Sequence, residues 1–171
     1  MARSLRSDSR LATLGFNMPM DHRIEADYYL YGIALGIISF DQAISWADKI
    51  IEAEDEPDIE IIEVALSRPR GRNGVLEALK EVKGSYNPQI AGAMLLADLY
   101  RLLKEGDSIK SISRKSLDVA RATQMLDEIR WKFDHMDDDI SLAEQGIYAD
   151  IDHCKTELGN LLLQYKYHEK T

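Results

Sequence analysis

The sequence predicts an all-α protein, a multi-helix bundle of about seven helices with a long helical hairpin at its C-terminal end. Apolar residues recur at intervals of three and four along most of the chain, and capping and stop residues separate these stretches. No segment shows the sustained alternation that is typical of a half-buried strand. With 171 residues, of which 45% are hydrophobic, one compact domain can bury a core without a disulfide or a metal ion.

The first two predicted helices have clear start and stop residues. Asp21 is a suitable N-cap for a helix that continues to Leu35, and Gly36 is its expected stop. Because this helix is apolar almost all round, we expect it to lie centrally among its neighbours. Ser39 and Gln42 have the spacing of a capping box at the start of the second helix.

Three further helices complete a predicted five-helix bundle over residues 21–106. A flexible tail is expected at residues 1–20. The third helix is expected over residues 58–67, with Ile59, Ile62 and Leu66 facing the core. Asn73 would cap a fourth helix. The fifth starts at Pro88 and stops at Gly106.

Residues 107–171 are predicted to form the long helical hairpin, packed on that bundle. Apolar residues, Leu126 and Ile147 among them, step by three and four from Val119 to Met136 and again from Ile140 to Tyr165, and we call this apolar stripe the C-terminal seam. Either the chain turns near Asp137–Ser141, or one uninterrupted helix needs a second chain to cover it. We favour the turn, because three consecutive carboxylates suit the start of a helix and Ser141 and Glu144 would form a capping box there.

No motif in the sequence is specific to an enzymatic reaction. Asp150-x-x-His153 occurs once, whereas a di-iron bundle needs paired Glu-x-x-His motifs. Neither a nucleophile elbow nor a phosphate-binding loop is present. We therefore expect a protein that is not an enzyme and that needs no cofactor and no metal.

Two local clusters each have a binding and a structural interpretation. The basic stretch Arg68–Arg72 would clamp a phosphate or carboxylate, or simply connect two helices. Tyr28, Tyr29 and Tyr31 would line a ligand pocket, or belong to the core with their polar tips near the surface.

Charge distribution is the most informative property of the sequence. The formal net charge is -9, and residues 24–66 carry eleven carboxylates against a single cation, Lys49. An acidic surface disfavours nucleic-acid phosphates and attracts a basic partner. The candidate partner-binding residues are Asp41, Asp48, Glu52, Glu54, Asp55, Glu56, Asp58, Asp137, Asp138 and Asp139.

The stretches GIISFDQAISWADKII (residues 36–51) and PDIEIIEVAL (residues 57–66) resemble small bacterial helical proteins. Some of these resemble immunity proteins of contact-dependent inhibition and related polymorphic toxin systems. The resemblance covers residues 36–66 and concerns helix packing. It implies an inhibitor that binds and neutralises a cognate toxin domain, and the acidic surface suggests a basic nuclease as that toxin.

The remaining expectations concern partners and compartment. A helical scaffold that dimerises through the C-terminal seam is one alternative, and a helical metal-binding protein or enzyme with a dispersed site is another. The single cysteine, Cys154, fits a reducing compartment, and no apolar stretch reaches the ~20 residues of a membrane span. We expect a cytoplasmic protein, monomeric rather than dimeric, that contacts neither nucleic acid nor membrane directly.

Overall fold

A computed structural model describes residues 20–147 and 150–170, and in these residues it contains helices and no strand. The all-α prediction is therefore confirmed. The predicted tail, residues 1–20, lies outside the described residues except for Met20. The helices are α2 (His22–Ala34), α3 (Phe40–Ala53), α4 (Ile59–Leu66), α5 (Gly71–Lys80), α6 (Pro88–Glu105), α7 (Ile109–Ala122), α8 (Asp127–Glu144) and α9 (Ile151–Leu163), with the 3₁₀ turns η1 (Arg68–Arg70) and η2 (Lys166–His168).

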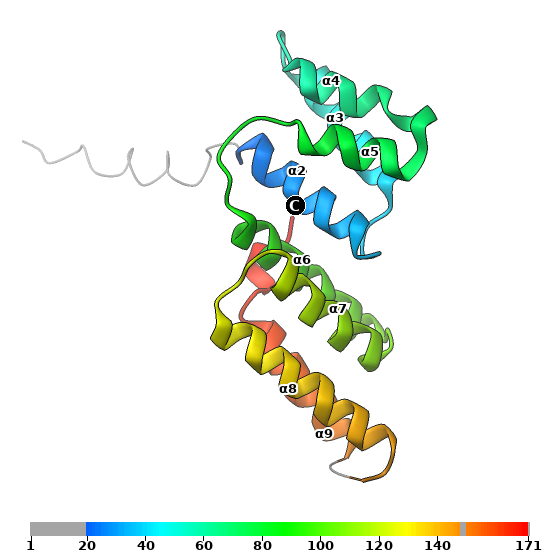
Figure 1. The fold of residues 1–171 in the computed structure, drawn as a ribbon, viewed down its shortest axis with the longest axis vertical. Helices are drawn as coiled ribbons and strands as arrows, with labels where there is room; N and C mark the ends of the chain where they lie inside the picture. Colours follow the sequence, from blue (N-terminus) through cyan, green and yellow to red (C-terminus); the bar gives the residue numbers. More distant parts are fainter. Residues whose placement is uncertain (1–19, 148–149, 171) are drawn as a thin grey trace, which may run out of the picture.

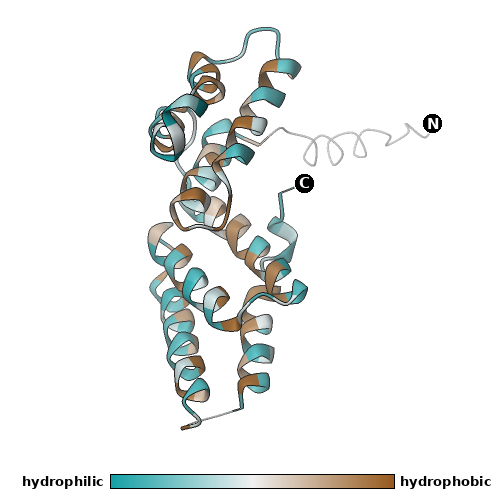
Figure 2. Ribbon diagram, turned by 90° about the vertical axis from the view of Figure 1, so that its right-hand side faces the viewer, coloured by the Kyte–Doolittle hydropathy of each residue, from teal (hydrophilic) through white to brown (hydrophobic). Residues whose placement is uncertain are grey.

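The helices form two tiers in an elongated molecule (Figure 1). Helices α2 to α5 make one tier and α6 to α9 the other, and α2 packs on α6 where the tiers meet. The connection between α3 and α4 lies at one extremity, and the chain between α8 and α9 turns at the opposite one. Figure 2 shows that this α3–α4 connection is hydrophilic, whereas hydrophobic residues gather where helices face each other.

Local capping explains why the first helices begin and end where predicted. The Asp21 side chain accepts a hydrogen bond from the backbone of Arg23 at 2.8 Å, and Ser39 accepts one from Asp41 at 3.2 Å. Gly36 and Gly106 adopt positive φ angles of 70° and 101° after α2 and α6. Glycine adopts this left-handed conformation without a steric penalty.

Two details of the same region differ from the sequence prediction. In α4 the buried residues are Ile61 and Val64, while Ile59 and Leu66 are each 66% exposed. This short helix is apolar on more than one face, so its packing against α3 selects the buried face. Helix α5 begins at Gly71 directly after η1, and Asn73 is therefore inside the helix rather than its cap.

Helix α6 is the most continuously buried element. Every residue from 91 to 99 is buried, and the helix contacts α2, α7, α9 and η2. A Cβ atom added to Gly92 would overlap Thr123 Oγ1 and lie 2.8 Å from Met125 Cε. The absence of a side chain at Gly92 therefore lets the turn after α7 lie directly on α6.

The C-terminal third contains three helices, and its predicted turn is wrong in position. Helix α8 runs uninterrupted through Asp137–Ser141, and the chain turns between α8 and α9 instead. Ser141 does not cap a helix, since its hydroxyl donates to the Asp137 carbonyl oxygen at 2.8 Å within α8. Leu126 and Ile147, expected on the apolar seam, are 72% and 67% exposed because both lie where the chain leaves the helices.

The close approach at Gly92 predicts the effect of a single added methyl group. Gly92→Ala should lower the free energy of unfolding by about 1–3 kcal/mol, because the methyl group overlaps the turn at Thr123. The matched control is Gly159→Ala in α9, where the nearest atom to the new Cβ is 4.0 Å away. This control should stabilise the protein by up to about 1 kcal/mol through helix propensity. Urea unfolding followed by circular dichroism measures both, and equal effects would contradict the packing argument.

Candidate functional site

A hollow of about 610 Å³ lies where α2, α3 and α6 meet the segment that follows α9. Helix α2 contributes three neighbouring side chains to it, because positions i, i+3 and i+4 share one face of a helix. Helix α3 contributes a stripe with the same spacing. The lining residues are Glu25, Tyr28, Tyr29, Asp41, Gln42, Ser45, Trp46, Lys49, Asp98, Arg101, Glu169 and Lys170.

The ammonium group of Lys170 occupies this hollow. It lies 3.0 Å from a carboxylate oxygen of Glu25 and donates to the hydroxyl oxygen of Tyr29 at 3.1 Å. Its distances to the ring centroids of Tyr29, Trp46 and Tyr28 are 4.2, 5.4 and 5.5 Å. These distances are in the range of cation–π attraction. One ammonium group is thus surrounded by three aromatic rings and a carboxylate.

Hydrogen bonds among the lining residues hold the rings in place. The hydroxyl of Tyr28 donates to Asp98 at 2.6 Å, which ties α2 to α6. The indole N–H of Trp46 donates to the second oxygen of Glu25 at 3.0 Å, which ties α3 to α2. Glu25 therefore contacts both Trp46 and Lys170. We call Glu25, Tyr28, Tyr29 and Trp46 the aromatic cage.

Burial shifts the pKa values of the groups in and around the cage. It raises the pKa of the Asp98 carboxyl and that of the Tyr28 hydroxyl, and it raises the pKa of Tyr29 to about 12. Burial also lowers the pKa of Lys170, while the Glu25 carboxylate opposes this effect. The cage therefore favours neutral phenols, and an ammonium group inside it depends on Glu25.

Five of the predicted partner-binding residues form one exposed set near the end of the molecule. They lie on the outer side of α3, in the α3–α4 connection and at the start of α4. All are exposed, and none makes an ion pair with another described residue. We call this set the α3–α4 acidic surface, and it consists of Asp48, Glu52, Asp55, Glu56 and Asp58.

Two further predicted residues lie beside this surface but already have partners. Asp41 pairs with Arg68 at 2.7 Å, and a carboxylate oxygen of Glu54 lies 3.2 Å from His22 Nε2. Asp41 also lines the hollow. Both are exposed, so they extend the acidic surface, but their partners offset part of their negative charge.

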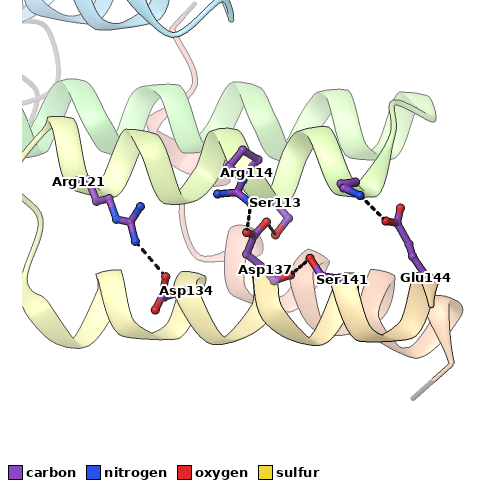
Figure 3. A network of polar contacts seen from close by, with 8 residues as sticks. Ser113, Arg114, Arg121, Asp134, Asp137, Ser141 and Glu144 are labelled. Carbon is purple, nitrogen blue, oxygen red and sulfur yellow. Dashed lines mark hydrogen bonds and ion pairs between the residues drawn. The ribbon is translucent and has the colours of Figure 1, made fainter. Parts of the chain in front are cut away.

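The second predicted block does not join the first, because it lies on α8 in the other tier. Asp137 is only 6% exposed, and Figure 3 shows its carboxylate turned toward α7. It accepts a hydrogen bond from Ser113 at 3.2 Å and pairs with Arg114 at 2.9 Å. Asp138 is exposed and Asp139 is half-buried. Asp137 therefore joins α7 to α8 and is not free to contact a partner.

The basic stretch Arg68–Arg72 also serves the fold. Arg72 donates to the carbonyl oxygens of Ile33 and Ala34, both at 3.2 Å, at the C-terminal end of α2. The last carbonyl groups of a helix lack an i+4 partner inside it, and Arg72 shares the Ile33 oxygen with the backbone N–H of Gly36. With Arg68 paired to Asp41 and Arg70 lying 3.9 Å from Glu63, all three arginines contact groups of the same chain.

The sequence analysis identifies only part of this site. Tyr28 and Tyr29 are its candidates for a pocket, whereas it does not single out Glu25 and Trp46 of the cage or their neighbours Asp98 and Lys170. The spacing of Glu25, Tyr28 and Tyr29 on one helical face is a signal for part of the cage. No local signal exists for Lys170, which lies 141 residues from Tyr29 in the sequence.

Comparisons of this chain with protein-family models, with curated proteins and with solved structures found no match. Within the described ranges, no group of three or more His, Cys, Asp or Glu side chains is arranged to hold a metal ion. None of the described helices combines the length and hydrophobicity needed to cross a membrane. The site defines the protein as a helical bundle with an ammonium-filled aromatic cage and a separate acidic surface.

The two neighbouring aspartates on α8 provide a test of their different roles. Asp137→Ala should lower the free energy of unfolding by about 2–3 kcal/mol, because it removes a buried acceptor of Ser113 and the partner of Arg114. Asp138→Ala is the matched control and should change stability by less than about 0.5 kcal/mol, because its side chain is exposed. Chemical denaturation compares the two, and similar losses would contradict the assignment of Asp137 to the fold.

The raised pKa of Tyr29 predicts a loss of stability at alkaline pH. Its pKa is about 12 in the folded chain and about 10 when unfolded. Between these values the folded state holds more protons, so the free energy of unfolding falls as the pH rises. Tyr29→Phe should make this fall less steep between pH 10 and 12. Urea unfolding at several pH values measures the slope, and Tyr167→Phe, at an 85% exposed position, should leave it unchanged.

Proposed function

We propose that this chain is a non-enzymatic binding protein that captures a basic partner protein through the α3–α4 acidic surface. The observation that carries the proposal is the division of charge within residues 24–66. Carboxylates such as Asp27, Glu60 and Glu63 have cationic partners within 4 Å, whereas the five of the acidic surface have none among the described residues. A basic partner would neutralise this uncompensated charge.

The position of the acidic surface supports protein capture. It occupies one extremity of an elongated molecule, so that a partner reaches it without steric hindrance from the other tier (Figure 1). Its carboxylates project from α3 and from the connection that follows it. Concentrated charge of one sign speeds the encounter with an oppositely charged protein, and dissolved salt weakens this effect.

The more specific form of the proposal is an immunity protein that neutralises a cognate toxin. Its support is the resemblance over residues 36–66, which contain α3, the connection and α4. The acidic surface lies within that stretch. If the toxin is a basic nuclease, the carboxylates would pair with the lysine and arginine side chains that hold nucleic-acid phosphates. Such an inhibitor would act in the cytoplasm.

The alternative of a scaffold that dimerises through the C-terminal seam has weaker support. Cys154, Leu158 and Leu162 are at most 3% exposed, and α9 packs on α6 and α8 of its own chain. Intramolecular packing therefore already covers the seam that a second chain would have to bury.

The test of the proposal begins with the gene immediately upstream. We expect it to encode a large secreted protein with a toxic C-terminal domain. The purified domain should bind this chain, and co-expression of the two should restore growth that the domain alone prevents. A toxic neighbouring domain that is neither bound nor neutralised would contradict the immunity function.

Charge reversal then tests which surface makes the contact. The variant Glu52→Lys/Asp55→Lys/Glu56→Lys should slow association with the toxic domain about tenfold at low salt, because steering by the acidic surface is lost. The matched control, Asp107→Lys/Asp138→Lys/Glu157→Lys, changes the net charge equally at exposed positions of the other tier. Stopped-flow fluorescence measures both rates, and equal slowing would show that only net charge matters.

A further inference from the structure

The aromatic cage is formed by α2 and α3, whereas its occupant comes from a short segment after α9. This segment, residues 164–170, includes η2 and ends at Lys170 in the described residues. The cage presents three ring faces and one carboxylate to a single ammonium group. Aromatic faces with a nearby carboxylate are the features by which proteins recognise lysine, methyl-lysine and other organic cations.

We propose that Glu25, Tyr28, Tyr29 and Trp46 form a binding site for the alkylammonium group of an external ligand, and that Lys170 occupies this site until the ligand displaces it. The ligand chemistry is a primary or methylated ammonium on an aliphatic chain. A lysine side chain of a polypeptide and a free alkylamine share this chemistry. The inference does not depend on the α3–α4 acidic surface.

The cage is held together without Lys170. Tyr28 is fixed by its hydrogen bond to Asp98, and Trp46 is fixed by its hydrogen bond to Glu25. The Tyr29 ring lies 5.2 Å from the Trp46 ring and 5.0 Å from the Tyr28 ring, measured between centroids. None of these contacts involves the 164–170 segment, so removal of Lys170 leaves a preformed site. Preformed sites bind a ligand without the entropic cost of ordering their walls.

The chain end that carries Lys170 has few buried contacts that resist its displacement. Tyr165 is buried and η2 packs on α6, but the four residues from 166 to 169 are exposed. Glu169 lies 3.5 Å from Arg101 in an exposed ion pair, which contributes little to stability. Beyond η2, Lys170 is therefore the main attachment of the chain. Segments with few buried contacts open at low free-energy cost.

Charges of both signs line the hollow beside the cage. Lys49 and Arg101 lie there together with Asp41, Asp98 and Glu169. Because these opposite charges partly cancel, the rim neither attracts nor repels a cation strongly. Asp41, Gln42 and Ser45 add acceptors along α3 for the polar part of a ligand. The cage is therefore the part of the hollow that selects an ammonium group.

The test uses the full chain with Lys170→Ala and observes the indole N–H signal of Trp46 by ¹⁵N NMR. The probes are Nα-acetyl-lysine amide, its Nε-trimethylated form and n-butylammonium, with Nα-acetyl-norleucine amide as the uncharged control. The cationic probes should shift this signal saturably, and norleucine should not. The signal of Trp131, which is 62% exposed on α8, serves as an internal reference and should remain unshifted.

Comparison with the unmodified chain tests displacement of Lys170. If Lys170 fills the cage about nine-tenths of the time, the cationic probes should bind about tenfold more weakly to the unmodified chain than to the variant. Tighter binding of the lysine amides than of n-butylammonium assigns the site to a polypeptide, and equal binding assigns it to a free amine. In Lys170→Ala, the cationic probes should also shift the backbone amide signal of Tyr29. Adding Trp46→Leu, which removes one ring of the cage, should abolish this shift.

Three results would overturn the proposal. The first is the absence of a Trp46 shift with every cationic probe in Lys170→Ala, and the second is an equal shift with norleucine. The third comes from the unmodified chain alone and does not depend on folding of the variant. The Lys170 side-chain protons next to the ammonium should be shifted upfield of those of Lys83, whose side chain is 78% exposed, because they lie over ring faces. Identical shifts for the two lysines would show that Lys170 is not in the cage.

Discussion

The burial of α6, the helix of the second tier on which the first tier packs, is the constraint on which the rest of the structure depends. Residues 91 to 99 are buried without interruption, so neighbouring helices must approach this helix from several sides. On the side of α2, a Cβ atom at Gly32 would overlap Ile38 and lie 3.0 Å from Leu95, which shows how close the approach is. This crossing places the Tyr28 hydroxyl 2.6 Å from a carboxylate oxygen of Asp98. The aromatic cage therefore exists because α2 is held at this position on α6.

The carboxylates of this acidic chain divide into those that hold helices together and those that face solvent. Asp98 and Asp137 receive hydrogen bonds from neighbouring helices, while Asp27, which has no exposed surface, pairs with Arg23 of its own helix at 2.8 Å. Such groups stabilise the fold only because their partners offset the cost of desolvation. The charges of the α3–α4 acidic surface face water and add no such link. The net charge of -9 therefore counts both kinds of carboxylate alike, and five of those that face solvent lie together on the α3–α4 acidic surface.

Sequence reasoning predicted the features that depend on nearby residues. Asp21, Ser39 and Gly106 mark helix ends through bonds or conformations confined to one turn, so their roles can be read locally. The C-terminal turn could not be placed in this way, because the apolar spacing continues across Asp137 and gives the same pattern with or without a break. The exposed carboxylates of α3 were also predictable, since solvated charge needs no tertiary partner. The cage and its contacts were not, because Glu25 meets Trp46 and Lys170, and Tyr28 meets Asp98, across long sequence separations.

Helix α3 carries both candidate sites, and they adjoin each other along one side of it. Asp41, Gln42, Ser45, Trp46 and Lys49 line the hollow. Glu52 follows Ser45 by seven residues and Asp41 by eleven, so it falls within about 20° of both around the helix. A partner on the acidic surface would therefore lie next to an ammonium ligand in the hollow. The packing of α3 on α2 and α4 holds the residues of both sites in fixed positions. Helix α3 is thus the shared support of two neighbouring sites, and Asp41 belongs to the edge of each.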